Sequence, residues 1–163
     1  MTENRLTLDT EREVFFYEQN HYYLSNFSSF AIETEGLVFP TVEHAYHWHK
    51  FYGLSPIRTE VQNKIFRARS AHDAYKIAQD YKARRVAEWD EIKDMTMFRL
   101  LCLKVRQHEY VRRKLLETGD RMLIENSWRD SYWGWGPDRQ GKNRLGEIWM
   151  RVRNELKQKE IMG

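Results

Sequence analysis

Residues 37–52 have the sequence LVFPTVEHAYHWHKFY, in which a short β-prone run leads into a helix. The apolar residues at 37–39 follow the turn-like pair Glu35-Gly36 and predict a strand. After the proline, the spacing of apolar and aromatic residues predicts a helix over 41–52. A junction between a strand and a helix supports functional side chains rigidly. This stretch therefore indicates both the fold class and the candidate site.

Short strands and further helices flank the junction. Runs of β-prone residues bounded by turn residues occur at 14–17, 24–34, 37–39 and 122–125. The first three predict a small meander. Capping residues or helical spacing indicate helices that start at Thr41, Pro56, Ala71, Glu88 and Asn143. The fourth helix extends to about residue 118 with a break near 107–110, and the last extends to about 159. The sequence predicts an α+β fold, a mainly helical single domain with a small β-sheet.

The composition fits one soluble domain. A chain of 163 residues with 41% hydrophobic residues can fill one core, so we expect a single domain over 1–163 with its core at about 14–158. No apolar run is long enough to span a membrane, and the polar N-terminus lacks a secretion signal. We expect a cytoplasmic protein with no membrane partner. The lone cysteine, Cys102, lies in an apolar stretch and is expected to be a buried thiol.

Basic residues form local clusters although the net charge is only +3. The clusters lie at 67–69, 82–85 and 112–114. They are compatible with an anionic ligand, but solvated helix faces are the more ordinary interpretation of any one cluster. Interleaved Trp, Tyr, Arg and Lys residues also fit a nucleic-acid-binding module without catalysis. Charge alone therefore names no substrate, and nothing in the sequence indicates the oligomeric state.

The predicted helix over 41–52 carries several polar side chains. Glu43, His47 and Lys50 fall within a sector of about 60° and form either a functional face or an ordinary exposed polar stripe. The histidines at 44, 47 and 49 spread over about 140°, too wide for one metal ion without distant ligands. We therefore expect a site without metal or cofactor.

A second candidate region is rich in glycine and tryptophan. Residues 130–136 have the sequence DSYWGWG, and Gly141 then leads into the last predicted helix. Glycines let the backbone approach a ligand closely. The N-terminus of that helix, with Lys142 and Arg144 nearby, can hold a phosphate while an indole stacks on a base. The alternative is an aromatic loop that covers the core.

Four ordered motifs carry a resemblance to a known family. They are LSNF at 24–27, PTVEH at 40–44 continuing to Lys50-Phe51, DSYWGWG at 130–136, and GKNRLG at 141–146 with Met150. The central helix adds Trp89, Lys93 and Met97 at i, i+4 spacing. The chain thus resembles the NADAR family, also called YbiA-like, from about residue 15 to about residue 156.

The resemblance implies a compact, mainly helical α+β fold and N-glycosidase activity. The implied partner is a phosphorylated ribosyl-base small molecule, such as a phosphoribosylamino-pyrimidine intermediate of riboflavin synthesis, or an ADP-ribosylated guanine in nucleic acid. The motif positions expected to line the pocket are Asn26, Phe27, Glu43, His44, Lys50, Trp89, Asp130, Trp133, Gly134 and Asn143. His47 departs from the family pattern, because many members have glutamine there, and imidazole and amide differ in donors and acceptors.

The chemistry of the bond suggests roles for three residues. Cleavage of a ribosyl C–N bond creates an oxocarbenium-like centre that a carboxylate stabilises while an acid assists the leaving nitrogen. Glu43 and Asp130 are the candidate carboxylates, in exchangeable roles. Lys50 either attacks a ring-opened ribosylamine to form a Schiff base, or it clamps a phosphate or forms an ion pair with Glu43. The nearby carboxylate of Glu43 favours a protonated lysine and hence the clamp.

Overall fold

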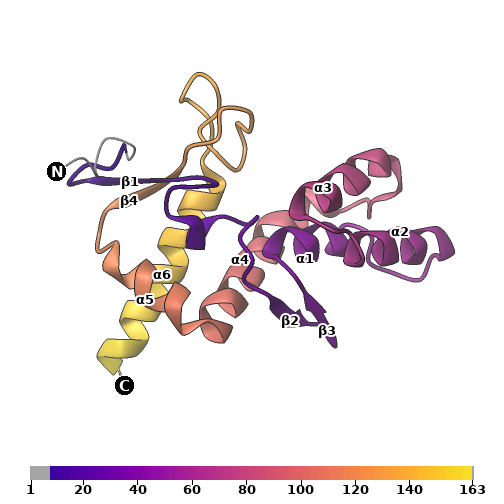
Figure 1. Ribbon diagram of the computed structural model, residues 1–163, viewed down its shortest axis with the longest axis horizontal. Coiled ribbons are helices and arrows are strands. Elements are labelled where there is room, and N and C mark those ends of the chain that lie inside the picture. Colours follow the sequence, from indigo (N-terminus) through magenta and orange to yellow (C-terminus); the bar gives the residue numbers. More distant parts are fainter. Residues whose placement is uncertain (1–7, 163) are drawn as a thin grey trace. The chain divides into compact units, whose positions relative to one another are not determined.

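The computed structural model describes residues 8–162, which belong to two compact units. Among the described residues, the end unit combines 8–25 with 108–162, and the middle unit is Asn26–Gln107. Figure 1 labels the helices and strands of both units along the chain. The expected single domain stays a prediction. Each unit contains some of the candidate site residues.

The end unit is built around a parallel pair of strands. Its elements are β1 (Glu13–Phe16), η1 (Tyr22–Leu24), α5 (Glu109–Glu117), β4 (Met122–Glu125) and α6 (Arg144–Met162). Residues 13 to 16 of β1 pair in register with 122 to 125 of β4. Helix α6 packs against β4, and its buried Trp149 donates from Nε1 to the carbonyl of Leu24 at 3.0 Å. This bond attaches η1 to α6.

The middle unit is a hairpin followed by helices. Its elements are β2 (Ile32–Thr34), β3 (Leu37–Phe39), α1 (Val42–His49), α2 (Pro56–Phe66), α3 (Ala71–Asp80), η2 (Lys82–Arg84) and α4 (Trp89–Gln107). Glu35 and Gly36 connect the antiparallel strands with φ of 55° and 72°, the left-handed pair of a two-residue hairpin turn. Helix α1 packs against α2, α3 and α4. Phe51, Val61 and Ile65 are fully buried in the helical core.

The strands pair differently from the predicted meander. Strand β1 pairs with β4, far along the chain, and β2 with β3 forms a separate sheet. Within the predicted run 24–34, only Ile32–Thr34 is a strand. The N–H groups of Leu24 and Ser25 donate to the carbonyls of residues 21 and 22, so they are used in a 3₁₀ turn and cannot join a ladder. The meander prediction was therefore wrong.

The predicted helices are confirmed, with small changes at their ends. The long helical signal breaks at His108, whose backbone is extended between α4 and α5. Pro56 opens α2, and Ser70 Oγ accepts from the N–H of Asp73 at the start of α3. Cys102 is half-buried rather than buried. It lies about 100° around α4 from the buried Leu101, off the face that enters the core.

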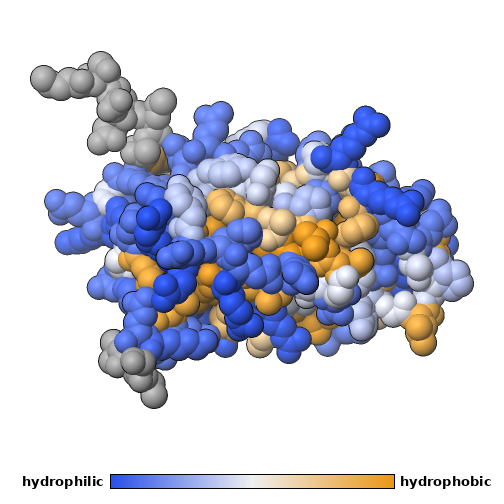
Figure 2. Space-filling view, turned by 60° about the horizontal axis from the view of Figure 1, so that its bottom comes forward, coloured by the Kyte–Doolittle hydropathy of each residue, from blue (hydrophilic) through white to orange (hydrophobic). Residues whose placement is uncertain are grey.

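Polar residues cover much of one face of the molecule, and apolar residues gather near the middle of that face (Figure 2). Hydrophilic residues predominate on the molecular face in Figure 2, in line with a mean hydropathy of −0.80 for the chain. Helices α4 and α6 carry charged residues along their lengths. In residues 8–162, no helix combines the length and the apolar character needed to cross a membrane.

Lys104 of α4 is a cation buried within the middle unit. Its side chain is fully shielded from solvent, and Nζ donates to Ser28 Oγ at 2.9 Å and lies 5.2 Å from the centre of the Phe30 ring. Burial lowers the pKa of Lys104 to about 7, because an ammonium is harder to desolvate than a neutral amine. Folding therefore favours loss of this proton above neutral pH.

The substitution Lys104→Met should change how stability depends on pH. Above about pH 7 the folded state holds a neutral Lys104 and the unfolded state still holds a charged one, so raising the pH favours folding. The free energy of unfolding of the unsubstituted protein should rise relative to that of the variant, by up to about 1.4 kcal/mol per pH unit. Urea unfolding of both proteins from about pH 7 to about pH 9.5 measures this, and a pH-independent difference would contradict it.

Candidate functional site

Thr41 and His44 fix the start of α1. Thr41 Oγ1 accepts from the His44 N–H at 3.2 Å and caps the helix. The His44 ring is buried, with Nδ1 2.8 Å from Thr41 Oγ1 and Nε2 3.0 Å from the carbonyl of Ala68. Because a carbonyl only accepts, Nε2 carries the proton and Nδ1 accepts from the hydroxyl. His44, predicted to line the pocket, therefore joins α1 to the segment between α2 and α3.

Glu43 and His47 form a buried hydrogen-bonded pair one turn apart on α1. His47 Nε2 lies 2.6 Å from Glu43 Oε1, and the residues are only 3% and 8% exposed. Burial lowers the pKa of His47; the negative charge of Glu43 opposes this effect and the positive charge of Lys50 adds to it. The imidazole is thus neutral and donates its Nε2–H to the carboxylate. Of the polar face predicted from spacing, Glu43 and His47 are buried and Lys50 is half-buried, so the face is not an ordinary exposed stripe.

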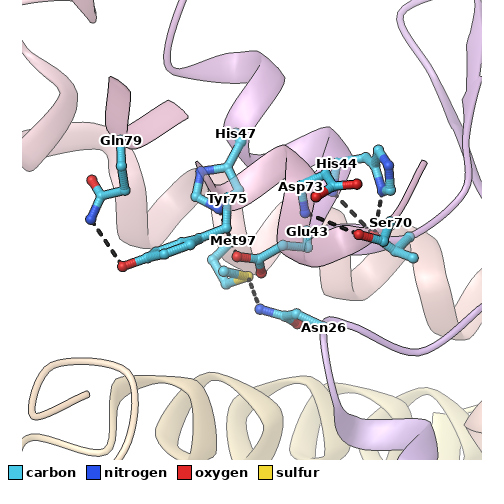
Figure 3. Close-up of polar contacts among 10 residues, drawn as sticks. Asn26, Glu43, His44, His47, Ser70, Asp73, Tyr75, Gln79 and Met97 are labelled. Carbon is cyan, nitrogen blue, oxygen red and sulfur yellow. Dashed lines mark hydrogen bonds and ion pairs between the residues drawn. The ribbon is translucent and has the colours of Figure 1, made fainter. Parts of the chain in front are cut away.

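Two acceptors of the middle unit are buried without a hydrogen-bond partner among the described residues. They are His47 Nδ1 and Asn26 Oδ1. Asn26 also contacts Met97 Sδ through Nδ2 at 3.5 Å, and its carbonyl accepts from the Glu43 N–H at 3.1 Å. Figure 3 shows Asn26, Glu43 and Met97 together. Because unpaired buried acceptors cost free energy, this group is suited to a ligand that supplies O–H or N–H donors.

Lys50 directly follows α1 and lies against two aromatic rings. Its Nζ is 5.0 Å from the centre of the Tyr46 ring and 5.9 Å from that of Trp89. Burial lowers the pKa of Lys50 to about 8, and the opposing effect of Glu43 is smaller. Desolvation therefore outweighs the charge of Glu43, which by itself favours a protonated Lys50. Trp89, predicted to line the pocket, is almost fully buried behind Lys50.

Two aromatic side chains of the middle unit are more accessible. Phe27, a predicted pocket residue, is 36% exposed, and Tyr75 of α3 is 40% exposed. Tyr75 was not among the predicted site residues. Its ring centre is 5.8 Å from that of His47, and its hydroxyl accepts from Gln79 Nε2 at 3.0 Å. Helical spacing puts Tyr75 a quarter turn from the buried Ala74, so the sequence alone indicates an ordinary surface residue.

Asp130, the second candidate carboxylate, lies in the end unit between β4 and α6. Its Oδ1 accepts from the backbone N–H groups of Tyr132 and Trp133, both at 2.8 Å. Its own N–H donates to Ser127 Oγ at 3.1 Å. These bonds make the Asp130 side chain the cap of a tight turn. Its catalytic role stays a prediction, as does the contact of Trp133 with substrate.

Gly134 and Asn143 hold the glycine-rich loop against β4. A Cβ on Gly134 would lie 2.8 Å from Ser127 Cβ, so a larger residue would force the loop to shift. Asn143 donates from Nδ2 to the carbonyl of Leu123 and accepts at Oδ1 from the N–H of Glu125, both at 2.9 Å. These two predicted pocket residues therefore have structural roles, which the motif by itself did not indicate.

The N-terminus of α6 offers less to a phosphate than the sequence suggested. The N–H groups of Arg144 and Leu145 donate to loop carbonyls at 3.0 Å, and the N–H of Lys142 donates at 2.8 Å. The backbone donors expected to bind an anion are thus already used. The ammonium of Lys142 lies 5.4 Å from the centre of the Tyr132 ring, and its contact with substrate stays a prediction.

The histidines of α1 are not arranged as metal ligands. His44 uses both ring nitrogens within the protein, and His49 Nδ1 lies 2.6 Å from the carbonyl of Ala45. In the part of the chain that the structure describes, no three His, Cys, Asp or Glu side chains are grouped to hold a metal ion. The expectation that the reaction needs no metal or cofactor stays a prediction.

A family model described as the NADAR domain matches residues 15–157. The chain belongs to the NADAR family. Family membership places it among N-glycosidases, hydrolases of N-glycosyl compounds. The match runs through both units.

The chain is similar to several named proteins. It is 33% identical over 132 residues to the N-glycosidase YbiA of Escherichia coli, covering 81% of this chain and 79% of that one. An N-glycosidase of Nostoc punctiforme is 33% identical over 146 residues, 88% of this chain and 92% of its own. A riboflavin biosynthesis protein of Vibrio vulnificus is 35% identical over 150 residues, 91% of this chain but only 40% of that longer protein.

The fold agrees with a solved structure. The NMR structure of Escherichia coli YbiA matches with a TM-score of 0.82 at 29% identity and covers 98% of this chain and 94% of that one. This likeness confirms the predicted α+β fold of helices with small sheets.

Substitutions at His47 should show whether this residue acts as a hydrogen-bond donor to Glu43 or only fills space in the core. Leucine removes the Nε2–H donor and leaves the carboxylate unpaired, which should lower turnover about tenfold or more. Glutamine retains an amide donor and should keep most of the activity. The measurements are the turnover number on an N-glycosyl substrate and the thermal midpoint of each variant.

The matched control is His49→Leu, a histidine of the same helix that does not contact Glu43. It should leave turnover close to that of the unsubstituted protein. Equal losses in His47→Gln and His47→Leu would show that the donor is not what matters at this position.

Proposed function

We propose that this chain hydrolyses the N-glycosidic bond between a phosphorylated ribose and a base, with phosphoribosylamino-pyrimidines of riboflavin biosynthesis as the substrate class. The relatives named N-glycosidases and the riboflavin biosynthesis protein of Vibrio vulnificus support this substrate. The single observation that carries the proposal within the fold is the buried carboxylate of Glu43 beside two unpaired acceptors, His47 Nδ1 and Asn26 Oδ1.

The ribosyl group suits this acceptor-rich environment. Ribose hydroxyls and an exocyclic amino group are donors, so they can satisfy the unpaired acceptors that the protein leaves. A charged carboxylate in a site shielded from water interacts strongly with the positive charge that develops on the sugar as the C–N bond breaks. Glu43 therefore takes the charge-stabilising or water-orienting role, and His47 holds its orientation.

The hydrolysis then balances without another reactant. The bond between C1′ and the base nitrogen breaks, its electron pair goes to the nitrogen, and the oxygen of water bonds to C1′. The proton released by the water goes to the departing nitrogen. Asp130 remains the second candidate for holding the ribose hydroxyls or the base.

Glu43→Gln tests the role of the carboxylate. The amide has nearly the same shape but no negative charge, so turnover should fall about 10²-fold or more while ligand binding persists. Mass spectrometry of products after incubation with phosphoribosylamino-pyrimidines should show free base and sugar phosphate with the unsubstituted protein. Glu60→Gln, an exposed glutamate on α2, is the matched control and should remain active.

Two results would count against the proposal. Near-normal turnover by folded Glu43→Gln removes Glu43 from catalysis. The second is release of ADP-ribose from ADP-ribosylated guanosine DNA with no release of base from the pyrimidine compounds. The substrate would then be linked to nucleic acid and would not be a free metabolite.

Borohydride trapping tests the alternative mechanism at Lys50. With a pKa of about 8, about a tenth of the Lys50 side chains are neutral at pH 7, enough for a nucleophile to form. We nevertheless expect no adduct, because the phosphate of a bound substrate favours the protonated form. Lys50→Arg should then keep part of its activity, since the positive charge survives. An increase in intact-protein mass by the sugar phosphate, absent in Lys50→Ala, would instead identify Lys50 as the nucleophile.

A further inference from the structure

Cationic side chains gather where the end of α1 meets the start of α4. The N–H of Val86 donates to the carbonyl of Lys50 at 2.8 Å, which places the segment after η2 beside the end of α1. Trp89, the first residue of α4, lies with its ring 5.9 Å from Lys50 Nζ. These contacts bring Arg85 and the first turns of α4 into the neighbourhood of Lys50.

One carboxylate is shared by two of these cations. Asp90 Oδ2 lies 3.0 Å from an Arg85 guanidinium nitrogen, and Asp90 Oδ1 lies 3.3 Å from Lys93 Nζ. The Asp90 side chain is 64% exposed, whereas those of Arg85 and Lys93 are 29% and 20% exposed. The cations thus lie deeper than the carboxylate that joins them, and Asp90 holds them side by side.

The cluster has more positive than negative charge. Burial has the largest effect on the pKa of Lys50 and lowers it, whereas the charge of Glu43 raises it. The charges of Arg85, Lys82 and Lys93 each lower this pKa further, so these side chains lie close enough to repel the Lys50 ammonium. The cations at 82, 85 and 93 act on Lys50, and the carboxylates that the contacts and charges identify beside them are Glu43 and Asp90. A phosphate monoester dianion has the opposite charge.

We propose that Arg85 and Lys93, with Lys50 beside them, form a binding subsite for the phosphate of a ribose phosphate. The guanidinium of Arg85 provides a planar pair of donors. Lys93 provides an ammonium donor from α4, and Lys50 provides another from the end of α1. This subsite rests on the proposed function for the identity of the sugar. It gives a role in anion binding to Arg85, one residue of the basic run 82–85.

The position of the subsite fits the catalytic candidate. Lys50 is seven residues after Glu43, about two turns or about 10 Å along α1 and its end. The charge of Glu43 raises the pKa of Lys50, so the ends of the two side chains are close enough to interact. The sugar carbon that bears the base would then reach Glu43 while the phosphate stays among the cations.

The competing phosphate site at the start of α6 is weaker. Its backbone N–H groups already donate to loop carbonyls and are not open to an anion. The cluster at Arg85 and Lys93 instead combines several cations around a single exposed carboxylate.

Calorimetric titration with ribose 5-phosphate tests the subsite without requiring turnover. Arg85→Met and Lys93→Met should each weaken binding at least about fivefold, the factor for one unit charge about 4 Å away in water. Free ribose should bind much more weakly than ribose 5-phosphate, and both variants should bind ribose as the unsubstituted protein does. The matched control is Arg84→Met, an exposed cation of the same basic run, which should bind ribose 5-phosphate normally.

The outcomes separate the subsite from the catalytic proposal. The subsite is overturned if ribose binds as tightly as ribose 5-phosphate, or if Arg85→Met and Lys93→Met weaken binding no more than Arg84→Met. Circular dichroism checks that each variant is folded. If Lys93→Met does not fold, the binding of ribose 5-phosphate by Arg85→Met alone decides whether the subsite exists. A parallel titration with ADP-ribose distinguishes a monoester from a diphosphate. Phosphate-dependent binding without hydrolysis of any N-glycoside would refute the proposed function and leave the subsite standing.

Discussion

The hydrogen bond from His47 Nε2 to Glu43 Oε1 is the interaction on which the candidate site depends. A carboxylate taken out of water needs strong donors, or it becomes protonated. Here the donor is a neutral imidazole whose own pKa is lowered by burial, so it supports the charge of Glu43 without cancelling it. The capped helix start at Thr41 and the backbone bond from Glu43 to Asn26 hold the pair in place.

Desolvation also lowers the pKa values of two lysines of the middle unit, the fully buried Lys104 and the half-buried Lys50. Lys104 and Lys50 both have lowered pKa values, about 7 and about 8. Lys104 is fully buried, so the free energy needed to desolvate its ammonium affects only the stability of the fold. Lys50 lies among other cations at the edge of the candidate site, where a ligand of negative charge would relieve the repulsion. The same physical effect therefore has a structural consequence at one position and a functional one at the other.

The motif residues divide into two kinds once their hydrogen bonds are known. Asp130 and Asn143 bond to backbone groups and shape the loop before α6, and His44 uses both ring nitrogens to connect helices. Asn26 and His47 instead keep buried acceptors unpaired. A sequence motif marks both kinds equally, because the spacing of residues does not show which polar atoms the fold satisfies.

The sequence by itself determined the helix starts at Pro56 and Ser70, the break at His108 and the shared face of Glu43 and His47, because caps and helical periodicity are local properties. Only the tertiary structure decided the parallel pairing of β1 with β4, since strand pairing depends on distant segments. It also decided which side chains are buried. Burial makes His47 neutral, lowers the pKa of Lys50 and leaves Asn26 Oδ1 without a donor, and burial arises from packing that no local pattern records.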